Sequence, residues 1–325
     1  MSLGGTIASV GEGPVAPGLG AADLAAGIDD LAATLEIEPL DARRVPSVEL
    51  TLEDLYELAS RVRERRGAGE LGIVVTQGTD TLEEAAFALE LLGAAPLVVT
   101  GSMRPPGAPG ADGPANLRAA LRVASDPATR DLGVLVVMND EIHAARFVRK
   151  VHTASPAAFA SPVAGALGDV VEGRVRLRTR VRALAALEAR PPYPAVPLVS
   201  IGFDDDGMAL GALADLEPFG LVLEGVGGAH VPARLVETIG RIAARSPVVL
   251  ASRTGAGPVL ERSYGYPGGE VDLLGRGLIS AGSLDARHAR VALRLLLAAG
   301  VSREGIARWF GDLDGSNAPR ARGYD

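Results

Sequence analysis

The chain has 325 residues, a net charge of −8 and no cysteine. The absence of cysteine excludes disulfides, thiolate zinc sites, iron–sulfur clusters and a cysteine nucleophile. The acidic balance, with arginines only singly or in short clusters, argues against a nucleic-acid or anionic-membrane partner. With 47% hydrophobic and 22% charged residues, the composition predicts a globular protein of about two domains.

Neither a membrane span nor a signal peptide is visible in the sequence. No run of about 18 apolar residues occurs, and residues 1–5 carry no charged segment followed by an apolar one. We therefore expect a cytoplasmic protein. The first residues have the character of the end of a strand, so a segment missing from the start would change this expectation.

Short apolar runs alternate with amphipathic segments along the chain. The runs are nearly continuous in Val, Leu and Ile, which is typical of strands buried on both faces. The predicted strands are residues 71–76, 96–100, 133–138, 198–203, 221–223 and 247–251. The predicted helices are residues 51–66, 81–92, 114–124, 232–244 and 285–299. This alternation predicts an α/β fold with a mainly parallel, doubly wound sheet.

Two of these helices begin with capping signals. Thr51 precedes an acidic first turn, and Thr81 is followed three residues later by Glu84, the pattern of a capping box.

The middle of the chain has a different pattern. In residues 165–182, Val and Leu are interleaved with Gly, Glu and Arg, which predicts a hairpin at a sheet edge. Four prolines follow between residues 191 and 197, and they predict a stiff, extended connector. We therefore expect an N-terminal domain over 1–184, a Pro-rich linker over 185–197 and a C-terminal domain over 198–325.

Three polar segments follow predicted strands, at the edge where open α/β sheets bind ligands. In residues 4–9, two glycines allow a tight turn that carries a threonine hydroxyl, although helix capping is the commoner meaning of such a segment. In residues 76–81, an N-cap needs one polar side chain, which Thr81 can supply, so Thr79 and Asp80 are left over for another role. The third segment, residues 138–152, ends with a lysine.

That lysine, Lys150, is the only one among 32 basic residues. Such a bias reflects a preference for arginine wherever either residue serves, so the remaining lysine either arose by drift or occupies a position where arginine fails. Arginine does not release its proton in a protein, whereas a desolvated lysine does. Composition alone leaves both interpretations open.

The chemistry that remains is based on hydroxyl groups. The sequence contains no G-x-S-x-G elbow, no H-E-x-x-H motif and no Gly-rich phosphate loop after a strand, and His143 and His152 match no metal-ligand spacing. A threonine is then the candidate nucleophile, and it needs a base to accept its proton. A lysine kept neutral by burial, oriented by a carboxylate and relayed through Thr79, supplies one. Thr79, Lys150 and Asp80 together can form such a unit.

Several motifs resemble those of bacterial-type L-asparaginases. The resemblance extends from residue 1 to about residue 312 and rests on Gly4–Ala8, Thr76–Glu84, Met103–Pro105 with Ala111–Leu117, and Val136–Asp140. It implies a larger N-terminal and a smaller C-terminal α/β domain, and a homo-oligomer, a dimer or a tetramer built as a dimer of dimers, with sites between subunits. It also implies hydrolysis of the side-chain amide of asparagine, an amino-acid substrate, without metal or cofactor.

The resemblance further assigns roles to individual residues. Thr6 is the expected nucleophile that forms an acyl-enzyme, and Thr79, Lys150 and Asp80 form the expected second catalytic group. Asp80 is also expected to bind the substrate ammonium, and Ser47 the α-carboxylate. Glu270 lies near the position of a glutamate that, in the family, reaches into a neighbouring subunit's site.

The sequence departs from the family pattern in two places. Family members often carry a tyrosine on the loop after the first threonine, whereas residues 7–23 contain none and Pro14 lies there instead. Either Thr79 and Lys150 take over more of the proton transfer, or activity is low. The second departure is His230, where many relatives have asparagine. It is either a helix cap or a residue that contacts a ligand or an interface.

Three functions therefore stay open. An asparaginase is the leading interpretation, and a related amidase, such as a glutaminase or the asparaginase-like subunit of a tRNA amidotransferase, is the second. The amidotransferase subunit usually has an extra N-terminal domain, which this chain lacks room for. A sensor that binds an amino acid without turnover is the third.

Overall fold

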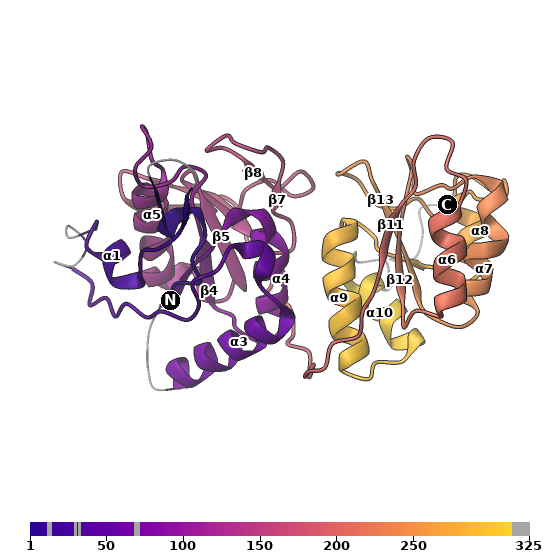
Figure 1. The fold of residues 1–325 in the computed structure, drawn as a ribbon, viewed down its shortest axis with the longest axis horizontal. Coiled ribbons are helices and arrows are strands. Elements are labelled where there is room, and N and C mark those ends of the chain that lie inside the picture. Colours follow the sequence, from indigo (N-terminus) through magenta and orange to yellow (C-terminus); the bar gives the residue numbers. More distant parts are fainter. Residues whose placement is uncertain (12–14, 29–30, 32–33, 68–71, 314–325) are drawn as a thin grey trace, which may run out of the picture. The chain divides into compact units, whose positions relative to one another are not determined.

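The computed structural model describes residues 1–11, 15–28, 31, 34–67 and 72–313. The chain forms two compact units, Met1–Ala186 and Leu187–Asp325 (Figure 1). No helix in the described part of the chain is long and apolar enough to cross a membrane.

A six-stranded sheet forms the centre of the N-terminal unit, in the order β10-β9-β6-β5-β4-β3. Its strands are β3 (Val74–Thr76), β4 (Leu97–Thr100), β5 (Val134–Met138), β6 (Glu141–Ala144), β9 (Gly168–Val171) and β10 (Arg174–Leu177). Strands β3, β4 and β5 are parallel, and β6, β9 and β10 extend the sheet in antiparallel fashion. Residues 1–3 lie beside β3, where Ser2 forms a parallel bridge to Thr76.

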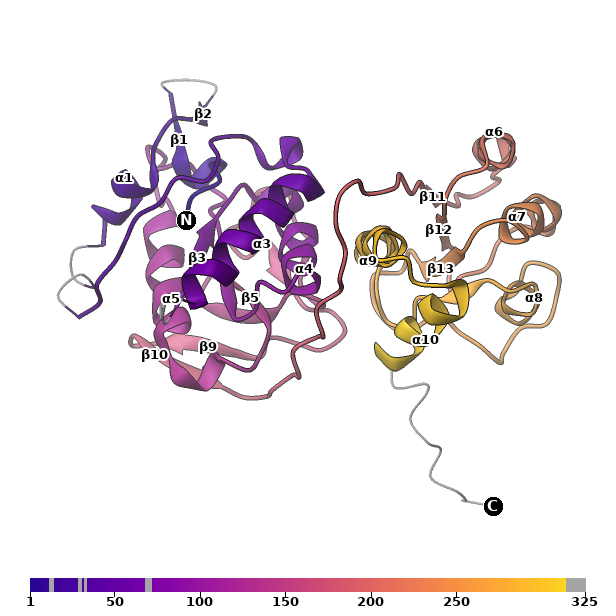
Figure 2. The same cartoon turned by 90° about the horizontal axis from the view of Figure 1, so that it is seen from below.

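Helices cover both faces of this sheet because its central strands are apolar on both sides. Helix α5 (Gly113–Ser125) packs on one face, against a cluster that includes Val98 and Leu135, while α4 (Leu82–Leu91) covers the other face with α3 (Leu52–Gly67) beside it (Figures 1 and 2). Shorter elements complete the unit: α1 (Ala21–Ala25), β1 (Ser9–Val10), β2 (Ala16–Pro17), β7 (Arg149–Lys150) and β8 (Phe159–Ala160).

The C-terminal unit is built on a four-stranded parallel sheet in the order β11-β12-β13-β14. Its strands are β11 (Leu198–Ser200), β12 (Leu221–Gly225), β13 (Val248–Ser252) and β14 (Ile279–Ser280). Helices α6 (Met208–Leu216), α7 (Val236–Ala243) and α8 (Glu270–Gly275) pack on one face, and α9 (Ala286–Ala298) and α10 (Arg303–Leu313) lie on the other (Figure 2).

The predicted α/β class, with a larger parallel-rich sheet unit and a smaller α/β unit, is confirmed. The predicted hairpin is also present, as β9 and β10 at the sheet edge. The strand prediction over 71–76 starts too early, since β3 begins at Val74 and Leu71 lies outside the described residues. Strand β14, only two residues long, was missed because so short a run carries no recognisable period.

The two predicted capping signals have different outcomes. At α3, Thr51 and Asp54 form a reciprocal pair: the Thr51 hydroxyl accepts from the Asp54 amide at 3.2 Å, and the Asp54 carboxylate accepts from the Thr51 amide at 3.0 Å. At α4, the capping box is wrong, because the side chain of Thr81 makes no cap hydrogen bond. Its hydroxyl donates instead to the Ser47 carbonyl at 2.8 Å.

Two buried titratable groups in the N-terminal unit make the free energy of unfolding depend on pH in opposite directions. Burial raises the pKa of Glu90 from 4.5 to about 7, although its carboxylate accepts from the Leu184 amide at 3.0 Å. Burial lowers the pKa of His143 from 6.5 to about 4. Folding therefore favours protonated Glu90, whose stabilisation is lost as pH rises towards 7, and neutral His143, whose stabilisation is lost as pH falls towards 4.

We expect these two contributions to oppose each other between about pH 4.5 and 6.5. Glu90→Gln, which keeps an oxygen for the Leu184 amide, should then expose the His143 contribution. The free energy of unfolding of this variant should rise by about 2 kcal/mol over that interval. His143→Gln should produce the opposite slope. Urea unfolding at several pH values tests this, and parallel profiles for the two variants would contradict it.

Candidate active site

Lys150 is the centre of a hydrogen-bonded cluster at the carboxyl edge of the N-terminal sheet. Its Nζ atom donates to the Thr79 hydroxyl at 2.9 Å and to the Asp80 carboxylate at 2.8 Å. The Lys150 side chain is 15% exposed and that of Asp80 65% exposed, so one end of the ion pair faces solvent. The expected grouping of Thr79, Asp80 and Lys150 is present as geometry.

The local fold brings these residues together from distant parts of the chain. Strand β3 ends at Thr76, and Thr79–Thr81 form a 3₁₀ turn that leads into α4. Lys150 arrives from the other direction. The chain leaves β5, reverses at Asn139 and Asp140, which both have positive φ, and returns along β6 to β7. Strand β7 pairs with β8, which fixes the backbone of Lys150.

The Gly4–Gly5 turn lies directly against the Thr79 turn. The Leu3 amide donates to the Thr76 carbonyl at 2.9 Å, which aligns the two segments. A Cβ atom on Gly5 would lie 2.1 Å from the Gly78 amide nitrogen, and Gly5 has a φ of +84°. Only glycine fits this contact and this conformation. The next residue, Thr6, is half-buried and begins its own 3₁₀ turn, so the two threonine-bearing turns meet.

Ser47 joins the same cluster. Its hydroxyl accepts from the Asp80 amide at 3.2 Å, and the side chain is buried. A Cβ atom on Gly78 would lie 2.9 Å from the Ser47 hydroxyl oxygen, so Gly78 is in close contact with this side chain. Thr6, Ser47, Thr79, Asp80 and Lys150 thus belong to one contiguous region of the N-terminal unit.

Asp112 and Asn116, for which the sequence suggested no role, hold the loops around this region. The Asp112 carboxylate accepts from the amides of Met103 at 2.9 Å and Arg104 at 2.8 Å. The Asn116 side chain donates to the Gly101 carbonyl at 3.0 Å and accepts from the Asn139 amide at 2.9 Å. These bonds fix the segments that follow β4 and β5.

Glu270 lies in the C-terminal unit, in a separate network. One carboxylate oxygen accepts from the amides of Ser263 at 2.6 Å and Tyr264 at 2.7 Å, and the other bonds to His230 Nε2 at 2.9 Å. The second ring nitrogen of His230 bonds to the Tyr266 hydroxyl at 2.9 Å. Burial raises the pKa of Glu270, but these hydrogen bonds outweigh it and the pKa is lowered overall. His230 therefore links Glu270 and Tyr266, a role that its position in the sequence did not reveal.

The two histidines of the N-terminal unit, His143 and His152, form hydrogen bonds with residues outside the Lys150 cluster. His143 is buried and bonds to the Ser161 hydroxyl at 3.0 Å, and His152 accepts from the amides of Ala154 and Ser155. Within the described part of the chain, no three His, Cys, Asp or Glu side chains gather as they would around a metal ion. Pro14, in the loop without tyrosine, lies outside the described residues.

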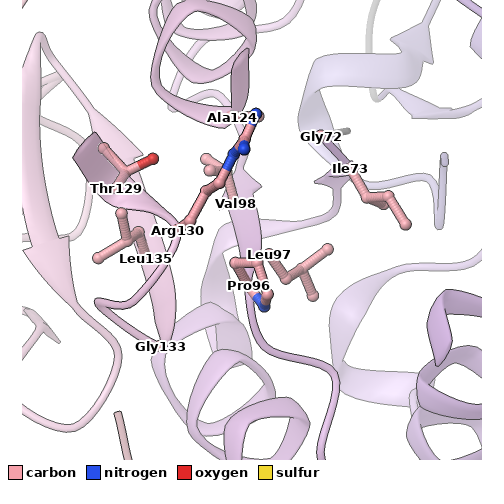
Figure 3. A pocket seen from close by; sticks show the side chains of 10 residues that line it. All are labelled: Gly72, Ile73, Pro96, Leu97, Val98, Ala124, Thr129, Arg130, Gly133 and Leu135. Carbon is pink, nitrogen blue, oxygen red and sulfur yellow. The ribbon is translucent and has the colours of Figure 1, made fainter. Parts of the chain in front are cut away.

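Two hollows lie away from this cluster. The one in Figure 3 lies at the opposite, amino end of strands β3, β4 and β5 and has a volume of only about 10 Å³, enough for about one water molecule. The other, of about 670 Å³, is lined largely by aliphatic side chains, including those of Leu24, Ile28 and Leu117. Neither hollow includes Thr6, Thr79 or Lys150 among its lining residues.

Comparison with known protein families assigns both units. The N-terminal asparaginase domain matches residues 1–182, and the glutaminase/asparaginase C-terminal domain matches residues 195–310. The chain belongs to the asparaginase family. The resemblance to bacterial-type L-asparaginases is thereby confirmed, and as a member of this family the chain is a hydrolase.

Individual relatives of this family member align over most of its length. An L-asparaginase from Bacillus licheniformis is 33% identical over 315 residues, covering 95% of this chain and 97% of its own. A protein named "Probable L-asparaginase" from Deinococcus radiodurans is 41% identical over 276 residues, covering 82% and 83%. The crystal structure of a "Probable Cytoplasmic L-asparaginase" from Campylobacter jejuni matches with a TM-score of 0.84 at 28% identity, covering 95% and 97%.

Proposed function

We propose that this asparaginase-family enzyme hydrolyses the side-chain amide of L-asparagine to L-aspartate and ammonia through an acyl-enzyme on Thr6. The observation that carries the proposal is the meeting of the Thr6 turn with the Thr79–Lys150–Asp80 cluster. A hydroxyl beside an oriented amine is the arrangement that nucleophilic amide cleavage requires.

In the proposed reaction, the Thr6 oxygen attacks the amide carbon and its proton passes to a base. The tetrahedral intermediate expels ammonia, which takes up a proton, and leaves an ester between Thr6 and the aspartyl group. Water then attacks the ester and releases L-aspartate, which regenerates the threonine. Thr79 and Lys150, which share a 2.9 Å hydrogen bond, form the proton relay for these steps. No cofactor takes part in the proposal.

Substrate binding falls to Asp80, which binds the α-ammonium, and to Ser47, whose hydroxyl binds the α-carboxylate. Glu270 is proposed as a further substrate-binding residue. Glu270 is 0% exposed and both of its oxygens are hydrogen-bonded within its own unit, so this role requires a local rearrangement that brings the carboxylate into contact with the substrate. The enzyme is also proposed to be a homo-oligomer. A cytoplasmic location is part of the proposal, supported by the description of the Campylobacter jejuni protein.

A glutaminase activity is the second candidate. One relative, from Pseudomonas fluorescens, is named a glutaminase-asparaginase and is 30% identical over 326 residues, covering 95% of this chain. The two substrates differ by one methylene, which is worth only about 1–3 kcal/mol of discrimination in a pocket. Residue types alone therefore do not decide between them.

Ammonia release tests the proposed function. The enzyme should release ammonia from L-asparagine, and the ratio of kcat/KM for L-asparagine and L-glutamine decides the preference. A protein that binds L-asparagine in a calorimeter but releases no ammonia would be a sensor, and the proposed hydrolysis would be wrong.

A further inference from the structure

We infer that Thr81 is a positioning residue that holds Ser47 in place to bind the α-carboxylate of the substrate. The inference rests on the proposed function, since it deepens the role given there to Ser47. It begins from the observation that Thr81 precedes α4 but does not cap it. A threonine at this position ordinarily accepts a hydrogen bond from an amide of the first turn, and α4 goes without the stabilisation that this bond provides.

Thr81 uses its hydroxyl on a different segment. The hydroxyl donates to the Ser47 carbonyl at 2.8 Å, which also accepts from the Leu50 amide at 3.2 Å. The Asp80 amide, one residue earlier, donates to the Ser47 hydroxyl at 3.2 Å. Two consecutive residues of the Thr79–Thr81 turn therefore donate hydrogen bonds to Ser47, one to its backbone carbonyl and one to its side-chain hydroxyl.

These two hydrogen bonds set the direction of the Ser47 hydroxyl. Because the hydroxyl oxygen accepts from the Asp80 amide, its own hydrogen stays available for donation to an anion. Ser47 is 2% exposed and its side chain lies against Gly78, so the hydroxyl has little freedom to find another orientation. Loss of the Thr81 bond would leave the hydrogen bond from the Asp80 amide to connect the short 3₁₀ turn at Ser47–Glu49 with the Thr79 turn.

The arrangement also fixes one binding group relative to the other. Asp80, the proposed ligand of the α-ammonium, lies between Thr79 and Thr81 in the same turn. Holding Ser47 on this turn fixes the spacing between the group for the α-carboxylate and the group for the α-ammonium. Interactions with these two parts of the substrate are the same in the ground state and in the transition state, so loosening them raises KM more than it lowers kcat.

Thr81→Val tests the inference, because valine keeps the branched shape and removes the hydroxyl. We expect KM for L-asparagine to rise about tenfold, the size of one hydrogen bond, with kcat changed less. Thr81→Ser should restore the wild-type KM. Thr51→Val is the matched control, because it also removes a threonine hydroxyl, here from the Thr51–Asp54 capping pair of α3. The free energy of unfolding should fall while KM stays unchanged.

A double-mutant cycle with Ser47→Ala separates positioning from a general structural effect. If Thr81 acts through Ser47, Thr81→Val should raise KM little further in the Ser47→Ala background. Full additivity of the two changes, or a Thr81→Val enzyme with wild-type KM and lowered stability, would overturn the inference. If Thr81→Val does not fold, the cycle is run with Thr81→Ala under the same criteria.

Failure of the proposed function is recognisable separately, because then the wild-type protein itself releases no ammonia from L-asparagine. In that case the same comparisons are made on the calorimetric Kd for L-asparagine. A Kd that Thr81→Val leaves unchanged, or the absence of binding by the wild type, would overturn the inference as well.

Discussion

Thr6→Ala is expected to lower kcat for L-asparagine by about 10³-fold or more, the scale on which removal of a nucleophile acts. The variant lacks the oxygen that forms the proposed ester, and Ile7 and Ala8, the other residues of this turn, carry no hydroxyl. Its thermal midpoint should stay close to that of the wild type, because Thr6 is half-buried and alanine fits its helical turn. Ammonia release and thermal unfolding measure the two quantities.

Two companion variants sharpen this result. Thr6→Ser keeps a hydroxyl at the same position and should retain part of the activity, whereas Thr179→Ala removes an exposed threonine at a distance in sequence and should change nothing. Mass spectrometry of the wild type mixed with L-asparagine and quenched rapidly should reveal an added aspartyl group that Thr6→Ala lacks. A Thr6→Ala enzyme with wild-type kcat would rule out Thr6 as the nucleophile.

The grouping of Thr79, Asp80 and Lys150 could be predicted because topology and composition agreed. Parallel strands place their carboxyl ends at one edge of a sheet, so polar residues that follow apolar runs converge there. The strand before Thr79 and the strand before the segment of Lys150 are both buried. The single lysine in an arginine-rich chain gave a second, independent pointer to the same edge.

The contacts of Thr81 and Glu270 could not be predicted in the same way. Thr81 has the sequence environment of a helix cap, and only the approach of Ser47 from 34 residues away explains why its hydroxyl points elsewhere. Glu270 and His230 are 40 residues apart, and nothing local indicates that they share a hydrogen bond. Long-range pairing of polar side chains depends on the packing of loops, which carries no periodic signal.

The fold shows the same division. Long amphipathic helices such as α3 and α9 were predicted within a few residues, because their period repeats over several turns. The α1, α6, α8 and α10 segments were missed. Helix α6 is rich in Ala and Leu without a clear polar face, and α8 is only six residues long.

Lys150→Arg is expected to lower kcat for L-asparagine by about 10²- to 10⁴-fold, the contribution typical of a positioned proton-transfer group. Arginine keeps the positive charge that pairs with Asp80, but its guanidinium does not release a proton in proteins. The substitution therefore removes the capacity for proton transfer and leaves the charge. Folding should be preserved, because the ion pair has one solvent-exposed partner.

Lys150→Met completes the test, since methionine removes both the charge and the proton. If Lys150 moves a proton through Thr79, the two variants should lose kcat to a similar extent. If it acts only as a cation beside Asp80, arginine should rescue activity and methionine should not. A Lys150→Arg enzyme with wild-type turnover would remove Lys150 from the proton relay. The 2.8 Å bond to Asp80 would then mark it as a group that orients the substrate-binding carboxylate.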